Sequence, residues 1–251
     1  MSVVAIIPAR YGSTRFPGKP LARIGARPMI QHVYESTSAA DFVDRTVVAT
    51  DDPRILEAVR AFGGDAVMTS EDHLSGTDRL AEVAAGLRAE WIVNVQGDLP
   101  FIRAETIRSC VECLVRDPAV PMATARTPIT SEDELLNPNV VKVVTDREGF
   151  ACYFSRAPIP FHRERPADPA QWGHRHLGIY VYRRDFLLRI AAMPAVALEL
   201  TEGLEQLRAL HHGFRIRVAD VEEAGVEVDT PEDLKRAEDY WSRLQPRKRY
   251  G

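Results

Sequence analysis

Three cations lie close together directly after the first apolar run of the chain. They belong to the segment Pro8-Ala-Arg10-Tyr-Gly12-Ser13-Thr-Arg15-Phe-Pro-Gly18-Lys19-Pro20. Glycines let backbone amides approach an anion closely, and Arg and Lys supply the positive charge that a triphosphate needs. The spacing matches neither a P-loop nor G-x-G-x-x-G, which counts against NAD or FAD. The segment therefore predicts a phosphate-binding loop of another type, with a solvated basic turn as the alternative.

Two carboxylates also follow short apolar runs. Asp98 comes directly after the run Trp91–Gln96 and Gly97, and Asp229 precedes a segment, 230–233, that is typical of a capped helix start. Mg²⁺ usually takes one or two protein carboxylates beside water and substrate oxygens. Both residues are therefore candidate magnesium ligands, although an Asp after a strand is also a common turn residue or helix cap.

A pair of cysteines and a pair of histidines have the spacing of metal ligands, but we do not expect either pair to bind a metal. Cys110-x-x-Cys113 falls inside an apparent helix without a second cysteine pair, and His174-x-His176 has no further ligand nearby. We expect helix packing for the first pair and no zinc at the second.

An alternation of apolar strands and helical segments would position these residues. The first half predicts strands at 3–8, 46–50, 66–69 and 91–96, and helices at 28–39, 53–62, 77–87 and 104–116. Continuous apolar strands between helices indicate a parallel sheet covered on both faces, and in such sheets ligands bind at the carboxyl ends of the strands. The loops after the strands are therefore the candidate site.

The pattern changes after about Pro118. Strands are expected at 122–127, 140–145, 150–154 and 176–182 with fewer helices, which indicates a mixed or antiparallel extension. A proline-rich loop over 157–173 would be functional or would grip a partner. The chain then predicts a helix over 201–212 stopped by Gly213, a strand at 214–218 and a helix over 231–244, followed by a basic tail interpreted as solvated.

Composition narrows the class of protein. The chain has 251 residues, 45% of them hydrophobic, and a formal charge of −4, so it lacks the basic excess expected for a nucleic-acid polymer or an anionic membrane. The apolar start is too short for a signal peptide or membrane span. Three cysteines are too few for a disulfide framework, so we expect a cytoplasmic protein.

Short motifs that carry these residues are spread over nearly the whole chain. They are, in order, Ile7-Pro-Ala-Arg-Tyr-Gly-Ser-Thr-Arg-Phe-Pro-Gly-Lys-Pro-Leu21, Ser75-Gly-Thr-Asp-Arg79, Asn94-Val-Gln-Gly-Asp98, Tyr153-Phe-Ser-Arg156, Arg175-His-Leu-Gly-Ile-Tyr180, Leu204-Glu-Gln-Leu-Arg208 and Val228-Asp-Thr-Pro-Glu-Asp233. Together they resemble the 3-deoxy-manno-octulosonate cytidylyltransferase (CMP-KDO synthetase) family. Related sugar nucleotidyltransferases share versions of the first motif, so the resemblance rests on the combination.

The resemblance implies a three-layer α/β/α nucleotidyltransferase (Rossmann-like) fold with a mostly parallel central sheet and a small mixed or antiparallel extension. It implies one domain, 1–251, with a core at about 1–118 and 200–245 and a sugar-binding and dimerisation lobe at about 119–199. In the implied reaction, CMP passes from CTP to the anomeric hydroxyl of an acidic keto-sugar (KDO) for lipopolysaccharide biosynthesis, and pyrophosphate leaves. A homodimer is implied as well.

The resemblance also assigns roles to residues. The implied catalytic residues are Arg10, Lys19, Asp98 and Asp229, of which the two aspartates would hold Mg²⁺. The implied nucleotide-binding residues are Pro8, Ala9, Arg10, Ser13, Arg15, Lys19, Ser75, Gly76 and Arg79. The implied sugar-binding residues are Gln96, Arg156, His176, Tyr180, Glu205 and Gln206. For Arg156, His176 and Glu205 the alternatives are a surface arginine, a structural imidazole and an exposed helix residue.

One position departs from the family pattern. The family commonly places an acidic residue after Gly97-Asp98, where this chain has Leu99. We expect this neighbour of the reaction centre to bear on sugar choice, which leaves an amino-octulosonate, another acidic sugar or a phosphonate as alternative acceptors. A nucleotide-binding regulatory protein without catalysis is the alternative from another class, and the presence of both carboxylates favours an enzyme.

Overall fold

The computed structural model describes residues 2–12, 16–73, 75–164, 166, 168, 171–222 and 225–244. In the first half, the strands β1 (Val3–Ala9), β4 (Arg45–Thr50), β5 (Ala66–Met68) and β6 (Trp91–Val95) alternate with helices. The helices are α1 (Met29–Ser38), α2 (Pro53–Ala61), α3 (Gly76–Ala85) and α4 (Ala104–Arg116). A short 3₁₀ turn, η1 (Lys19–Leu21), and the hairpin strands β2 (Arg23–Ile24) and β3 (Arg27–Pro28) follow β1. The strands and helices predicted for this half are confirmed to within two residues.

The second half adds β7 (Met122–Pro128), α5 (Glu132–Leu136), β8 (Lys142–Thr145), β9 (Ala151–Ser155), β10 (His174–Arg183), α6 (Arg184–Ala191), α7 (Ala197–Glu202), α8 (Gln206–His211), β11 (Ile216–Asp220) and α9 (Pro231–Leu244). The main sheet has the strand order β11-β7-β10-β6-β1-β4-β5, and β8 and β9 extend it beside β10. β10 is antiparallel to both β6 and β7, whereas the other pairs along this order are parallel. The predicted α/β fold, with its mostly parallel sheet and antiparallel extension, is therefore confirmed.

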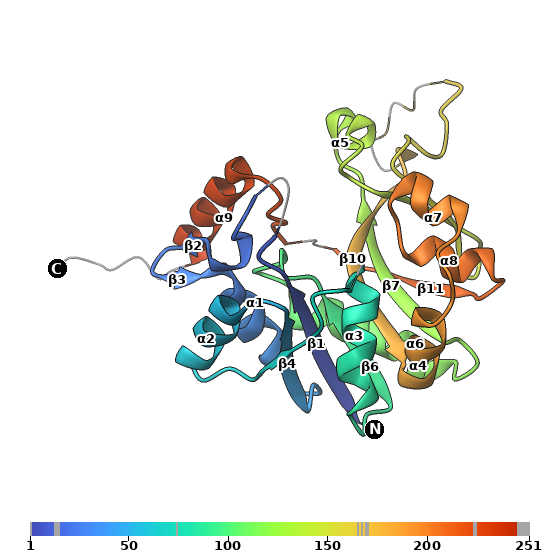
Figure 1. Cartoon of the computed structure of the whole chain (residues 1–251). Helices are drawn as coiled ribbons and strands as arrows, with labels where there is room; N and C mark the ends of the chain where they lie inside the picture. The colour runs from blue at the N-terminus through green and yellow to red at the C-terminus, as the bar shows by residue number, and fades with distance from the viewer. Residues whose placement is uncertain are drawn as a thin grey trace.

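Alternating burial along the strands produces three layers. In β1, Val3, Ala5 and Ile7 enter one apolar cluster and Val4 and Ile6 enter another, because successive side chains of a strand point to opposite faces. The first cluster is covered by α1, α2 and α4, and the second by α3, α6 and α8. Figure 1 shows these helices on the two faces of the sheet. Burial on both faces explains why the sequence of β1 is continuously apolar.

The helix predicted over 201–212 is wrong as one element. The structure has two helices, because Gly203 adopts a left-handed backbone (φ 64°) that ends α7 before α8 begins. The helices are tied together by a buried ion pair, in which Arg208 Nη2 lies 2.5 Å from Glu199 Oε1. The sequence analysis also missed α6, which packs Phe186, Leu187 and Ile190 against the sheet.

The sheet is continuous across residue 118. β10 pairs with β6 and β7 pairs with β10, so residues of the expected lobe contribute strands to the main sheet. The division at residue 118 stays a prediction. α5 projects beyond the sheet on the side away from α9 and the β2–β3 hairpin (Figure 1). None of the helices in the described ranges is long and apolar enough to cross a membrane.

Candidate functional site

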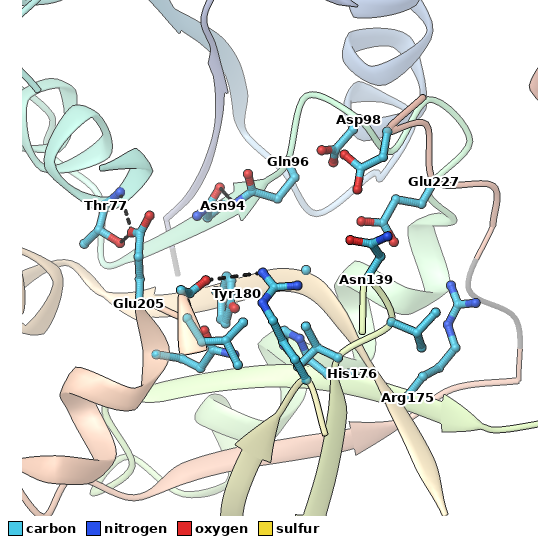
Figure 2. A pocket seen from close by; sticks show the side chains of 18 of the residues that line it. Thr77, Asn94, Gln96, Asp98, Asn139, Arg175, His176, Tyr180, Glu205 and Glu227 are labelled. Carbon is cyan, nitrogen blue, oxygen red and sulfur yellow. Dashed lines mark hydrogen bonds between the residues drawn. The ribbon is translucent and has the colours of Figure 1, made fainter. Parts of the chain in front are cut away.

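A cavity of about 250 Å³ opens at the carboxyl end of β6, between that strand, β10 and the start of α8. Figure 2 shows the side chains of Asn94 and Gln96 facing Tyr180, with Asp98 and Glu227 at the other end. The wall contains all the residues implied for sugar binding and both implied metal ligands: Gln96, Arg156, His176, Tyr180, Glu205, Gln206, Asp98 and Asp229. Residues from five separate motifs thus meet in one cavity.

Gly97 brings the end of β6 close to the end of β1. A Cβ atom at this position would lie 3.0 Å from the Pro8 carbonyl oxygen, which is too close for other residues without a backbone shift. The glycine therefore allows Asp98 to stand beside the loop that carries the cations.

Lys19 joins the two carboxylates. Its Nζ lies 2.9 Å from Asp98 Oδ2 and 3.2 Å from Asp229 Oδ1, and all three side chains are largely buried. Burial alone would lower the pKa of Lys19, but the charges and hydrogen bonds of Asp98 and Asp229 raise it above the usual value. Lys19 therefore remains an ammonium between two carboxylates.

The position of Asp229 follows from the packing of α9. Thr230 and Asp233 form the predicted capping pair, since Asp233 N donates to Thr230 Oγ1 (3.2 Å) and Thr230 N donates to Asp233 Oδ2 (2.9 Å). Val228 and Ala237 are buried in a third apolar cluster with Phe101. Docking of α9 thus fixes the residue just before its cap, and the Asp229 carboxylate pairs with Lys19.

The two aspartates fit a magnesium ion by the chemistry of their donors. Their oxygens already converge on one cation, Nζ of Lys19. Within the described ranges, no group of three or more His, Cys, Asp or Glu side chains could hold a metal. Mg²⁺ keeps several water and substrate oxygens and needs only one or two protein carboxylates, so two aspartates suffice.

Glu227 and Arg175 also line the cavity, and the sequence analysis missed both. Desolvation between the surrounding elements, together with the charges of Asp98 and Asp229, raises the pKa of Glu227 to about 7. Arg175 pairs with Glu134, with 2.8 Å between Nη1 and Oε1. Each lies within two residues of a residue singled out from the sequence, which is the signal that could have found them.

His176 and Tyr180 lie on β10 at a β-bulge. The register against β7 shifts between Leu177 and Tyr180, and such bulges redirect side chains near active sites. His176 Nε2 lies 2.8 Å from Thr124 Oγ1, and burial followed by the charge of Arg175 lowers the pKa of His176 to about 3. Burial also raises the pKa of Tyr180. Both groups are therefore neutral hydrogen-bonding groups at neutral pH.

Glu205 precedes α8, and its carboxylate binds backbone N–H groups at the start of α3. Its oxygens accept from Gly76 N (3.2 Å) and Thr77 N (3.0 Å), while Ser75 caps the same helix through Asp78 N (3.1 Å). The carboxylate also accepts from the Thr77 hydroxyl, as Figure 2 shows. The amide of Gly76 is therefore occupied by Glu205, which links the expected sugar-binding and nucleotide-binding residues.

Gln206 and Arg156 differ in their partners. Gln206 is 4% exposed, and its Nε2 has no hydrogen-bond partner within the described chain. A buried amide without a partner is costly, so this donor is available to a ligand. The Arg156 guanidinium instead donates to the carbonyls of Glu202 (2.7 Å) and Pro138 (3.0 Å).

A smaller cavity adjoins the first through Gln96 and Glu205. Its wall contains Pro8, Ala9, Arg10, Ser75, Gly76 and Arg79. Arg79 pairs with Asp51 (2.5 Å) and donates to Thr69, so its guanidinium is held at the ends of neighbouring strands. Ser13 and Arg15 lie outside the described residues.

Leu99 does not share the surroundings of Asp98. Its side chain is 5% exposed and belongs to the core cluster on the α1, α2 and α4 face. The expectation that this residue bears on sugar choice therefore has no support from a cavity contact, because apolar packing takes Leu99 into the core.

Comparisons with known proteins agree with one another. A family model described as cytidylyltransferase matches residues 4–217. The 3-deoxy-manno-octulosonate cytidylyltransferase of Syntrophotalea carbinolica is 57% identical over 95% of this chain and 98% of that protein. The enzyme of the same name from Geobacter metallireducens is 53% identical over 98% of this chain and 100% of that protein. The solved structure of a CMP:2-keto-3-deoxy-manno-octonic acid synthetase complexed with CTP superimposes with a TM-score of 0.91 and 44% identity, covering 98% of this chain and 100% of that one.

The low pKa of His176 predicts a pH dependence of stability. The unfolded chain takes up a proton near pH 6.5, whereas the folded protein does so only near pH 3, so this stability is present above pH 6.5 and is lost as pH falls. Between pH 7 and pH 5 we expect the unfolding free energy of the wild type to fall by about 2 kcal/mol more than that of His176→Gln. Urea unfolding at both pH values measures this difference. His211→Gln, at an exposed histidine of α8, should keep the wild-type pH dependence; equal dependence in His176→Gln would contradict the neutral imidazole.

Proposed function

The chain belongs to the 3-deoxy-manno-octulosonate cytidylyltransferase family, and from that premise we propose that the two adjoining cavities form its active site. It is an enzyme that transfers CMP from CTP to the acidic keto-sugar KDO, as in lipopolysaccharide biosynthesis. The smaller cavity would hold the nucleotide and the larger one the sugar. The observation that carries this assignment is the convergence of Asp98 and Asp229, which line the larger cavity, on Lys19 of the segment after β1.

The reaction requires little covalent chemistry from the protein. The anomeric hydroxyl oxygen of the sugar attacks the α-phosphorus of CTP, the bond to the bridging oxygen of the β-phosphate breaks, and pyrophosphate leaves. The enzyme must therefore position two anions and stabilise the charge that moves onto the leaving group. A site that combines cations, a metal and fixed hydrogen-bond donors meets these requirements.

The charged residues would divide the work. Arg10, Arg15 and Lys19 would hold the triphosphate, and Asp98 and Asp229 would hold Mg²⁺. When bound there, Mg²⁺ would offset the negative charge between nucleophile and phosphate and favour ionisation of the hydroxyl. The pairing of Lys19 with both aspartates supports this division, because it shows that the two carboxylates converge on one positive charge, as they would on a bound Mg²⁺.

The sugar would lie against β10 and the start of α8. His176 and Tyr180 would offer neutral hydrogen-bonding groups, Gln206 a free amide donor, and Gln96, Arg156 and Glu205 the remaining polar contacts. On the nucleotide side, Pro8, Ala9, Ser75, Gly76 and Arg79 surround the smaller cavity, where cytosine would bind, and Ser13 belongs to the adjoining loop. Polar groups in this number suit a polyhydroxylated acid.

Two further properties belong to the proposal. Leu136 and Phe161 of the lobe are 58% and 84% exposed, and Leu200, at the boundary between the lobe and the core, is 71% exposed. A two-fold partner is the commonest cover for such apolar side chains. We therefore propose a homodimer formed by the lobe. The three cysteines are free, which supports a cytoplasmic location.

The metal role predicts the effect of Asp98→Asn. The amide keeps the size of the side chain but removes the charge that Mg²⁺ requires, so we expect kcat below about a tenth of the wild-type value, a loss of more than ~1.4 kcal/mol. Asp229→Asn should behave in the same way. Pyrophosphate release at saturating Mg²⁺ measures the rate, with Asp185→Asn, an exposed aspartate of α6, as the control that keeps full activity. Higher residual activity at Asp98 would contradict the metal role.

The proposed cavities also predict substrate choice. With KDO as acceptor, parallel assays with CTP, UTP, ATP and GTP should show a clear preference for CTP. With CTP as donor, KDO should be used in preference to an amino-octulosonate or a phosphonate. Those acceptors were left open only by the departure at Leu99, and this residue lies in the core rather than in the cavity wall. Efficient turnover of a neutral sugar phosphate with UTP would overturn the assignment.

The dimer can be tested by its mass. Light scattering at micromolar concentration should give about twice the chain mass of 28.1 kDa, and Leu200→Asp should shift the population toward monomer because it places a charge on the apolar surface. Lys235→Asp, at an exposed position of α9, is the matched control and should leave the mass unchanged. A wild-type monomer that stays fully active at nanomolar concentration would contradict the proposal.

A further inference from the structure

Lys142, the first residue of β8, is a buried cation outside the charged centre. Its side chain is 0% exposed, and its Nζ donates to the carbonyl oxygens of Asn137 (2.9 Å), Val140 (2.7 Å) and Arg156 (2.7 Å). An ammonium has three N–H donors, so these bonds use all of them. Burial and the nearby charge of Arg156 lower the pKa of Lys142.

The three carbonyls belong to two segments of the cavity wall. The turn from Asn137 to Val140 carries Asn139 and Val140 into the larger cavity, and Arg156 enters it from the end of β9. Figure 2 shows Asn139 beside Glu227, facing Asp98. Lys142 therefore lies behind the wall and touches both segments that form this part of it.

The three converging carbonyls need a side chain with several hydrogen-bond donors between them. Carbonyl oxygens that converge on one point cannot bond to one another, because all of them are acceptors and their partial charges repel. Burying an ammonium is unfavourable unless it is fully hydrogen-bonded, and an apolar side chain of the same length would leave the three acceptors unsatisfied. A simple packing role would not require a charge here.

A second network of hydrogen bonds connects the same two segments of the wall. The Arg156 guanidinium donates to the Pro138 carbonyl (3.0 Å), and its backbone N–H donates to Glu202 Oε2 (2.9 Å). Glu202 also accepts from the Ser155 hydroxyl (2.6 Å). The turn, the end of β9 and the end of α7 are thus cross-linked, with Lys142 at the centre of the carbonyl cluster.

We propose that Lys142 is a positioning residue for the acidic sugar: its ammonium fixes the turn at residues 137–140 and the backbone of Arg156 at the separation that the sugar requires. This inference rests on the proposed function of the larger cavity. The smaller cavity is lined by other residues, so nucleotide binding does not depend on this contact.

Steady-state kinetics of Lys142→Met separate positioning from stability. Methionine keeps the length of the side chain and removes every donor, so we expect the KM for KDO to rise by at least about tenfold, equivalent to ~1.4 kcal/mol, while the KM for CTP changes less than twofold. Lys142→Gln retains two donors and should fall between wild type and methionine. It also carries the test if Lys142→Met does not fold.

The matched control is Val143→Ala, the next residue of β8, which is 1% exposed in the core and is not bonded to the three carbonyls through its side chain. It should lower stability and leave the KM for KDO unchanged. If the Lys142 variants raise both KM values equally, or lower stability only, as Val143→Ala does, the residue merely packs and the proposal fails.

Hydrogen exchange provides a readout that does not depend on activity. The amides of Asn139 and Val140 are bonded to Asn137 in the native turn, at 2.9 and 3.1 Å. Exchange across residues 137–141 should accelerate in Lys142→Met and Lys142→Gln but not in Val143→Ala; unchanged exchange would overturn the inference. Absence of KDO turnover by the wild type would instead refute the proposed function. Hydrogen exchange would then still test whether Lys142 holds the turn.

Discussion

The Lys19 ammonium lies 2.9 Å from one oxygen of Asp98 and 3.2 Å from one oxygen of Asp229, residues that stand 79 and 210 positions further along the chain. Three partly buried charges can be held together only if the elements that carry them are rigid, since each would otherwise regain water. Lys19 comes from the turn after β1, Asp98 from the turn after β6, and Asp229 from the start of α9. The pairing of β1 with β6 and the docking of α9 on Phe101 and Met29 therefore serve this contact.

Neutral and charged groups are separated within the larger cavity. At one end, Lys19 pairs with Asp98 and Asp229, and burial followed by the charges of these two aspartates raises the pKa of Glu227 to about 7. At the other end, His176 and Tyr180 are kept neutral by burial. This separation of charged from neutral groups suits a reaction in which phosphate charge is stabilised at one end of the cavity and sugar hydroxyls are oriented at the other.

Charged side chains in and behind the wall of the larger cavity form hydrogen bonds mostly with the backbone. Lys142 donates to three carbonyls, and Glu205 accepts from two amides at the start of α3. These contacts connect segments that are far apart in the sequence, such as α3 with α8. The wall therefore depends on a small number of charged side chains, of which Lys142 lies behind it and Glu205 is part of it.

The sequence by itself determined the repeated pattern of strand and helix in the first half, because continuous apolar strands and capped amphipathic helices are local signals. It also determined which motifs carry the charged residues, and the larger cavity unites the six residues implied for sugar binding. Tertiary structure alone decided the rest. Gly203 splits one predicted helix in two through its left-handed backbone, Leu99 enters the core although it follows Asp98, and Glu227 and Arg175 join the site through the approach of distant elements. Burial and neighbouring charge depend on segments that are remote in the chain, so the local pattern marked the neighbours of Glu227 and Arg175 but not the surroundings of these two side chains.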